Sequence, residues 1–91
     1  MIFIELSRRF KKNVRKAGRE AEVSATLKLM RDGFGKPHAH TGLAIRNLGK
    51  HLYECRTGRA WRLIFEAHKG VLTFDFVGNH DEVQNYLRGK H

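Results

Sequence analysis

The sequence has a single cysteine, Cys55, few acidic residues and no long apolar run. One cysteine excludes an internal disulfide, and its place within a strand-like pattern predicts a small buried side chain in a reducing compartment. The apolar start, residues 1–6, is too short for the hydrophobic region of a signal peptide, and no later segment approaches membrane-spanning length. We therefore expect a soluble cytoplasmic protein with no membrane partner, the one weak option being surface binding by a basic first helix.

The shortage of acidic residues leaves a strong positive charge. The 91 residues include 18 Lys and Arg against 9 Asp and Glu, for a formal charge of +9. Nucleic acid is the first candidate partner, because Lys and Arg supply most of the sequence-independent affinity for phosphate polymers. The simpler alternative is a surface that is basic only for solubility. An excess of nine positive charges in 91 residues fits this alternative less well.

The stretch from residue 52 to residue 77, LYECRTGRAWRLIFEAHKGVLTFDFV, predicts three strands separated by Gly58 and by Lys69-Gly70. Alternate residues of a strand point to opposite faces of the sheet. The face expected in the core consists of Tyr53, Cys55, Trp61, Leu63, Phe65, Leu72, Phe74 and Phe76. The face expected to be charged and solvated consists of Glu54, Arg56, Arg62, Ile64, Glu66, Thr73 and Asp75, with Arg46 from a preceding strand.

The flanking segments complete an α+β fold. Earlier segments predict a strand, two helices joined near Gly18, and a further strand, at residues 2–6, 8–16, 19–31 and 43–48. After the central strands, Asn79 or Asp81 can cap a short helix that presents Val83, Tyr86 and Leu87 on one face. We expect a single domain over residues 1–91, with an N-terminal strand, a helix hairpin on one face of a mostly antiparallel four- to five-stranded sheet, and a short C-terminal helix.

Nothing in the sequence indicates a cofactor. His38 and His40 lie in a loop rich in Gly and Pro, but a metal site needs further ligands, and the other histidines are scattered without a cysteine or carboxylate cluster. The glycines fit turns, and neither a phosphate-binding loop nor a dinucleotide motif is present. We expect no metal and no small-molecule cofactor.

The charged face offers a route to chemistry on RNA. Arg46, Arg56 and Arg62 can clamp a phosphodiester, because a guanidinium donates paired hydrogen bonds to phosphate oxygens. Glu54 and His80 could serve as general base and general acid for attack of a 2′-hydroxyl on its own phosphate, which only RNA permits. Spacing alone favours a simpler alternative, in which Arg and Glu form cross-strand pairs on a solvated face.

Two segments, LYECRTGRAWRLIFE and VLTFDFVGNHDEVQNYL, preceded by a strand and a helix hairpin, resemble the RelE/ParE superfamily of bacterial type II toxins. In the RelE branch, which cleaves mRNA on the ribosome, the resemblance implies that Arg62 and Arg56 hold the phosphate. It implies a general acid or charge stabiliser at His80 and a base-stacking or orienting ring at Tyr86. Glu54 departs from the lysine of some members, whereas others use a carboxylate as general base.

The resemblance also implies partners. A small antitoxin with an acidic or amphipathic segment would bind the toxin, and mRNA and the ribosome would be its targets. The further basic residues expected to contact RNA are Arg46, Lys50, Arg59, Lys11, Lys12 and Arg15. Two alternatives remain open at this point: a non-catalytic inhibitor of DNA gyrase, as in the ParE branch, and a non-toxic basic RNA-binding module of the same fold.

Overall fold

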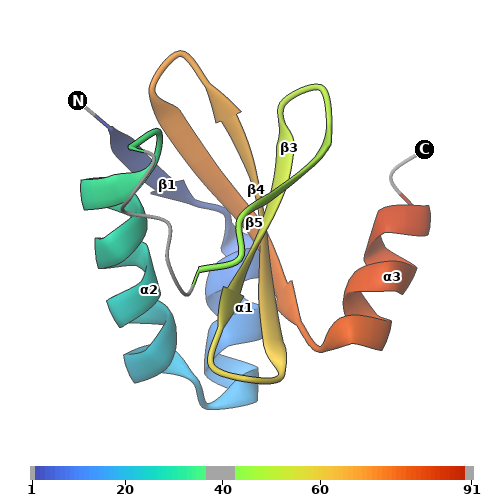
Figure 1. Ribbon diagram of the computed structural model, residues 1–91. Helices are drawn as coiled ribbons and strands as arrows, with labels where there is room; N and C mark the ends of the chain where they lie inside the picture. The colour runs from blue at the N-terminus through green and yellow to red at the C-terminus, as the bar shows by residue number, and fades with distance from the viewer. Residues whose placement is uncertain (1, 37–42, 90–91) are drawn as a thin grey trace.

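The computed structural model describes residues 2–36 and 43–89 as a five-stranded sheet with helices on both faces (Figure 1). The strand order is β1-β5-β4-β3-β2, with β1 parallel to β5 and the other neighbours antiparallel. The elements are β1 (Phe3–Leu6), α1 (Arg8–Ala17), α2 (Glu20–Gly33), β2 (Arg46–Gly49), β3 (Leu52–Thr57), β4 (Trp61–His68), β5 (Val71–Gly78) and α3 (His80–Arg88). This architecture confirms the predicted α+β class, the helix hairpin, the mostly antiparallel sheet and the C-terminal helix.

The helix hairpin forms where local signals place it. The Ser7 side chain accepts a hydrogen bond from the backbone N–H of Phe10 at 3.0 Å and so caps α1. Gly18, with φ of 65°, ends α1 in the left-handed conformation that glycine adopts without strain. The predicted ends of the helices are correct to within two residues, since α2 continues to Gly33 instead of stopping at Arg31.

The main core lies between this hairpin and one face of the sheet. Its buried members include Phe10 of α1 and Met30 of α2, which pack on the strands together with Cys55, Leu63, Phe65, Leu72, Phe74 and Val77. Phe65 stacks on Phe74 with ring centroids 4.7 Å apart. Most of the predicted core face is therefore confirmed. Among the described residues no helix is long and apolar enough to cross a membrane.

The second half of β5 does not follow the predicted alternation. Ile64 pairs with Phe76 but Phe65 pairs with Phe74, so Asp75 is an extra residue that bulges from the strand. A one-residue bulge shifts every later side chain to the opposite face. The placement of Phe76 in the main core was therefore wrong: its ring faces α3, and Val77 takes the core position, 4% exposed.

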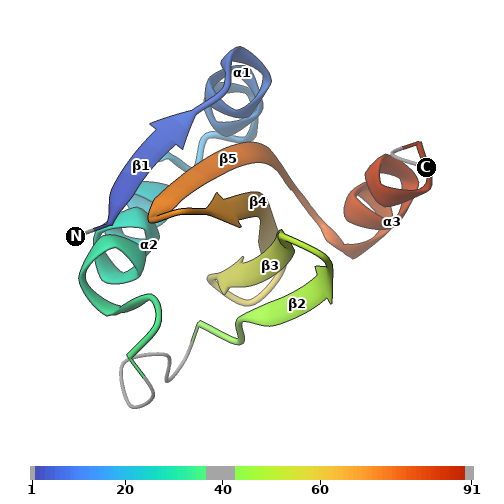
Figure 2. The ribbon, with the colours of Figure 1, turned by 90° about the horizontal axis from the view of Figure 1, so that it is seen from above.

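The face expected to be solvated is partly covered. Figure 2 shows α3 on the other side of the sheet from α2, and both Ile64 of β4 and Val83 of α3 are fully buried. Glu54, expected in solvent, is only 3% exposed. The expectation that this whole face stays wet was wrong, because a short apolar side of α3 packs over its centre. The strand predicted at residues 43–48 begins only at Arg46, since Ala44 has a left-handed φ of 48°.

The prediction that the protein binds no metal concerned His38 and His40 in part, and these two residues lie outside the described residues. Within residues 2–36 and 43–89, no three His, Cys, Asp or Glu side chains are close enough to hold a metal ion.

The thiol of Cys55 is expected to be inert in the native protein. Burial, with a smaller effect from neighbouring Glu54, raises the pKa of this thiol to about 12. The reactive thiolate is therefore scarce in the folded state at pH 8, whereas an unfolded cysteine, with a pKa of about 8.5, ionises appreciably. Because the folded pKa is raised, the group costs no stability below its ordinary pKa and lowers stability as pH rises beyond it.

Mass spectrometry after iodoacetamide treatment at pH 8 checks this expectation. Alkylation should be at least tenfold slower in buffer than in denaturant, a ratio that corresponds to about one pKa unit of thiolate suppression. Equal rates in the two conditions would show that Cys55 is accessible in the fold.

Candidate functional site

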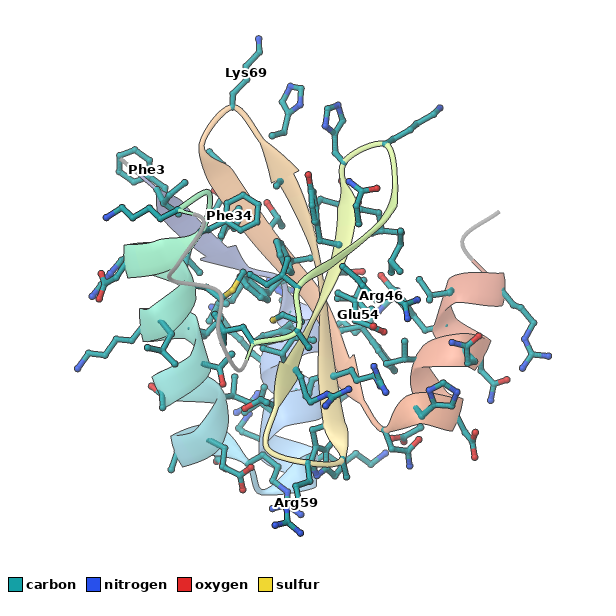
Figure 3. All side chains as sticks on the ribbon, in the orientation of Figure 1. Phe3, Phe34, Arg46, Glu54, Arg59 and Lys69 are labelled. Carbon is teal, nitrogen blue, oxygen red and sulfur yellow. The ribbon has the colours of Figure 1, made fainter. Side chains whose placement is uncertain are left out.

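Three strands bring arginines to one buried carboxylate beneath the α3 side of the sheet. Arg46 pairs with Glu54 across β2 and β3, and Arg56 pairs with Arg62 across β3 and β4. Nη1 of Arg62 donates to Oε2 of Glu54 at 3.2 Å, and Nε of Arg46 lies 3.8 Å from the same oxygen. In Figure 3, Arg46 and Glu54 lie between the sheet and α3. We call Arg46, Glu54, Arg56 and Arg62 the arginine cluster.

Burial differs sharply within the arginine cluster. The side chain of Glu54 is 4% exposed, that of Arg62 is 24% exposed and that of Arg46 is 68% exposed. A buried carboxylate is tolerated when cations and hydrogen bonds compensate its lost hydration, and Arg62 supplies both. Glu54 therefore fixes the direction of the Arg62 guanidinium. Arg46 is exposed near the same carboxylate, and Arg56 is exposed at the register position opposite Arg62.

His80 leaves the sheet beside this cluster. Gly78 is the register partner of Arg62, and His80 follows two residues later as the first residue of α3, with its side chain exposed. A capping box fixes this junction: Asn79 and Glu82 exchange hydrogen bonds of 2.9 Å between side chain and backbone. A Cβ at Gly78 would lie 2.9 Å from Glu82 Cβ, so the close turn requires glycine.

Tyr86 ties α3 to the bulge in β5. Its hydroxyl donates to the carboxylate of Asp75, and its ring stacks on Phe76 with centroids 4.4 Å apart. Arg9, from α1, lies 3.6 Å from Asp75 Oδ2 and 5.5 Å from the centre of the tyrosine ring. Burial first, and the hydrogen bond to Asp75 second, raise the pKa of Tyr86 above its usual range. These contacts hold the hydroxyl and the ring of Tyr86 against β5 and α1.

The Tyr86→Phe substitution tests this orienting contact. It removes the hydroxyl but keeps the stacked ring, and hydrogen bonds to charged groups contribute about 1.5–3 kcal/mol. Because the pair is partly exposed, we expect the lower end, about 1.5 kcal/mol of lost stability in urea denaturation. Tyr53→Phe is the matched control, since the Tyr53 ring packs on Phe65. Equal losses in both variants would remove any special role for the Tyr86 hydroxyl.

The residues predicted to contact RNA do not all lie on one face of the protein. Lys11, Lys12 and Arg15 are exposed on α1, which packs on the opposite face of the sheet from the arginine cluster. Arg59 lies in the β3–β4 turn, at the end of the sheet opposite the turn that holds Lys69 (Figure 3), and Lys50 lies in the β2–β3 turn. Of the six predicted contacts, Arg46 belongs to the arginine cluster, and Lys50 lines a groove together with Arg46.

Sequence reasoning missed the roles of Arg9 and Asp75. Asp75 was expected to be an ordinary solvated strand residue, and Arg9 was one of many exposed cations on the first helix. Their contact depends on the bulge, and the strand pattern carries no signal for a bulge whose cause is the pairing with β4.

Comparison with solved structures gives the same fold. YafQ from E. coli aligns with a TM-score of 0.73 and 19% identity over 91% of this chain and 98% of that chain. A copper-bound mutant toxin from Helicobacter pylori aligns with a TM-score of 0.72 and 17% identity over 91% and 99%. The RelB–RelE antitoxin–toxin complex from Methanococcus jannaschii gives 0.68 and 13% over 90% and 96%. No family model and no curated protein sequence matches. The chain has the RelE-like toxin fold.

Proposed function

We propose that this protein is the toxin of a type II toxin–antitoxin pair and that it cleaves mRNA on the ribosome. The observation that carries the proposal is the Arg62 guanidinium. The buried carboxylate of Glu54 orients it, and the exposed Arg46 and Arg56 are the other arginines of the cluster. This arrangement suits an anion that gains charge during a reaction. The fold that the chain shares with YafQ and RelE supports the same proposal.

The proposed reaction is an intramolecular transfer on RNA. The 2′-hydroxyl releases its proton to solvent water as its oxygen attacks the adjacent phosphorus. The bond to the 5′-oxygen breaks, and the products carry a 2′,3′-cyclic phosphate and a 5′-hydroxyl. Arg62 and Arg56 hold the non-bridging oxygens and stabilise the charge that develops on them. His80 donates a proton to the departing 5′-oxygen. Glu54, buried under its two arginines, is a positioning residue for Arg62 in this scheme.

The proposed protein partner is an antitoxin. Neighbouring solved structures include the DinJ–YafQ toxin–antitoxin complex from E. coli. In this chain a groove of about 400 Å³ runs between α1 and α2. Its apolar lining includes Phe10, Val14, Val23 and Leu27, and its charged lining residues are Lys11, Arg15 and Glu20. An amphipathic segment with acidic flanks would fit such a groove by apolar contact and charge. We place the protein in the cytoplasm, where mRNA and ribosomes are found.

Induced expression, with and without the neighbouring open reading frame, tests the proposal. We expect growth arrest that the neighbouring frame relieves, and new mRNA ends that carry a 5′-hydroxyl. Arrest with intact mRNA and inhibited DNA supercoiling would instead support the gyrase inhibitor. RNA binding without arrest or cleavage would support a non-toxic binding module.

A further inference from the structure

Two turns at one end of the sheet mirror each other in sequence and meet in space. Gly49-Lys50-His51 joins β2 to β3, and His68-Lys69-Gly70 joins β4 to β5. The imidazole rings of His51 and His68 are in contact, with centroids 4.8 Å apart and planes at 77°. We call Lys50, His51, His68 and Lys69 the turn cluster. It lies at the end of the sheet where Figure 3 labels Lys69.

Turn geometry does not account for the two lysines. Lys50 and Lys69 have left-handed φ values of 45° and 48°, which cost an ordinary residue about 1–2 kcal/mol and which glycine or asparagine adopts more readily. Lys69 and Gly70 both have positive φ, the pattern of a type I′ hairpin turn that prefers Asn-Gly. Turn geometry therefore does not select lysine at either position, and what each lysine adds there is an exposed positive charge.

A groove joins the turn cluster to the arginine cluster. It has a volume of about 680 Å³ and runs between the β2–β3 turn and α3, from Arg46 to Lys50 and His51. Its apolar lining comes from Leu48, Leu52 and Leu87. Glu66 also lines the groove and would repel a phosphate there. A strand in this groove would therefore turn its bases to the leucines and its phosphates to the rim at Lys50. Lys69 lies next to this rim in sequence and contact, because it follows His68, whose ring touches His51.

We propose that the turn cluster binds the phosphate backbone of a single RNA strand that passes along this groove from the arginine cluster. The ammonium groups of Lys50 and Lys69 neutralise two phosphates, and the imidazole pair between them offers N–H donors to the same backbone. The distance along β4 from Arg62 to His68 is about 20 Å, so this contact is separate from the scissile phosphate. The choice of RNA as the ligand rests on the proposed function. RNA can nevertheless bind the turn cluster whether or not the protein cleaves it, so binding is tested separately.

The Lys50→Asn/Lys69→Asn variant tests the proposal, because asparagine removes both charges and suits the left-handed turns. Its affinity for a fluorescent 2′-O-methyl single-stranded RNA is measured by anisotropy from 0.1 to 1 M KCl, since this RNA lacks the attacking hydroxyl. Each lost phosphate contact lowers the slope of log affinity against log salt by about 0.7, so we expect a decrease of about 1.4. Over this decade of salt, that decrease equals a roughly 25-fold loss of binding at 0.1 M.

Lys28→Gln/Lys36→Gln is the matched control, because it removes two exposed positive charges from α2 and the segment after it. We expect its salt slope to stay within about 0.3 of the original, by the same counterion arithmetic. Equal losses in the two double variants, or no loss in the turn variant, would overturn the proposal. Retained RNA binding with weakened antitoxin binding would also overturn it, in favour of a protein interface.

The single substitutions keep the test valid if the double variant is unstable, since each should remove about 0.7 of the slope. The two proposals can also fail separately. One outcome is a lower salt slope for Lys50→Asn/Lys69→Asn while the original protein cleaves no mRNA in cells. It would support RNA binding by the turn cluster and contradict the ribonuclease. Cleavage in cells by the original protein, with an unchanged salt slope in the double variant, would support the ribonuclease and contradict RNA binding by the turn cluster.

Discussion

Arg62→Lys is expected to reduce mRNA cleavage in a translating extract by about 10²–10³-fold, the effect of removing one preorganised donor from a developing anion. Lysine keeps a positive charge beside the buried Glu54 carboxylate. It lacks the planar fork that holds two phosphate oxygens at once, so the substitution separates phosphate recognition from neutralisation of Glu54. Primer extension measures the cleavage, and thermal unfolding reports the fold.

The controls for Arg62 separate folding from chemistry. Arg62→Ala should also abolish cleavage and growth arrest. It leaves Glu54, among the described ion pairs, with Arg46 at 3.8 Å, and breaking a buried pair can cost about 3–5 kcal/mol. Arg31→Lys is the matched control, because Arg31 is exposed on α2 and pairs only with neighbouring Asp32 among the described ion pairs. If Arg62→Lys cleaves as fast as the original protein, the arginine cluster is not the site.

His80→Gln is expected to slow cleavage by about 10²–10⁴-fold, the usual contribution of a positioned general acid. Its thermal stability should not change, because the His80 side chain is exposed and the capping box uses Asn79 and Glu82. Glutamine can donate a hydrogen bond but cannot release a proton to the 5′-oxygen. Cleavage at a single mapped mRNA site in the translating extract measures the effect.

A modified substrate gives a second measurement on His80. If the bridging 5′-oxygen at the mapped site is replaced by sulfur, the leaving thiolate needs no proton, because thiols are far more acidic than alcohols. We therefore expect His80→Gln to cleave this substrate nearly as fast as the original protein does. If His80→Gln slows cleavage of the normal and the sulfur-substituted substrate equally, His80 is not the general acid, and its contribution is to RNA binding.

The pattern of the central strands was predictable because it is local. Period-two alternation in β3, β4 and the first half of β5 placed Cys55, Leu63 and Phe74 in the core, where the structure has them. Capping and turn signals at Ser7 and Gly18 placed the first helix in the same way, and the last helix begins after Asn79, one of the two caps that the sequence offered. Each of these signals depends on residues within one or two turns of chain, which the sequence contains in full.

The incorrect predictions concern features that depend on contacts between segments far apart in the chain. The bulge at Asp75 exists only relative to β4, and it sent Phe76 to α3 against the alternation. The burial of Glu54 depends on α3 above it and on arginines from β2 and β4. A strand pattern cannot distinguish a solvated carboxylate from one that neighbouring strands enclose.

By itself the sequence determined the positive charge, the α+β order of elements and which arginines alternate on the same strand face. Only the tertiary structure decided that Arg62 and Arg46 share one buried carboxylate, that the basic residues of α1 lie on the opposite face, and that two mirrored turns bring His51 against His68. The physical reason is that charge and periodicity are properties of neighbouring residues. Strand register and helix packing instead decide which of the residues far apart in the chain come into contact.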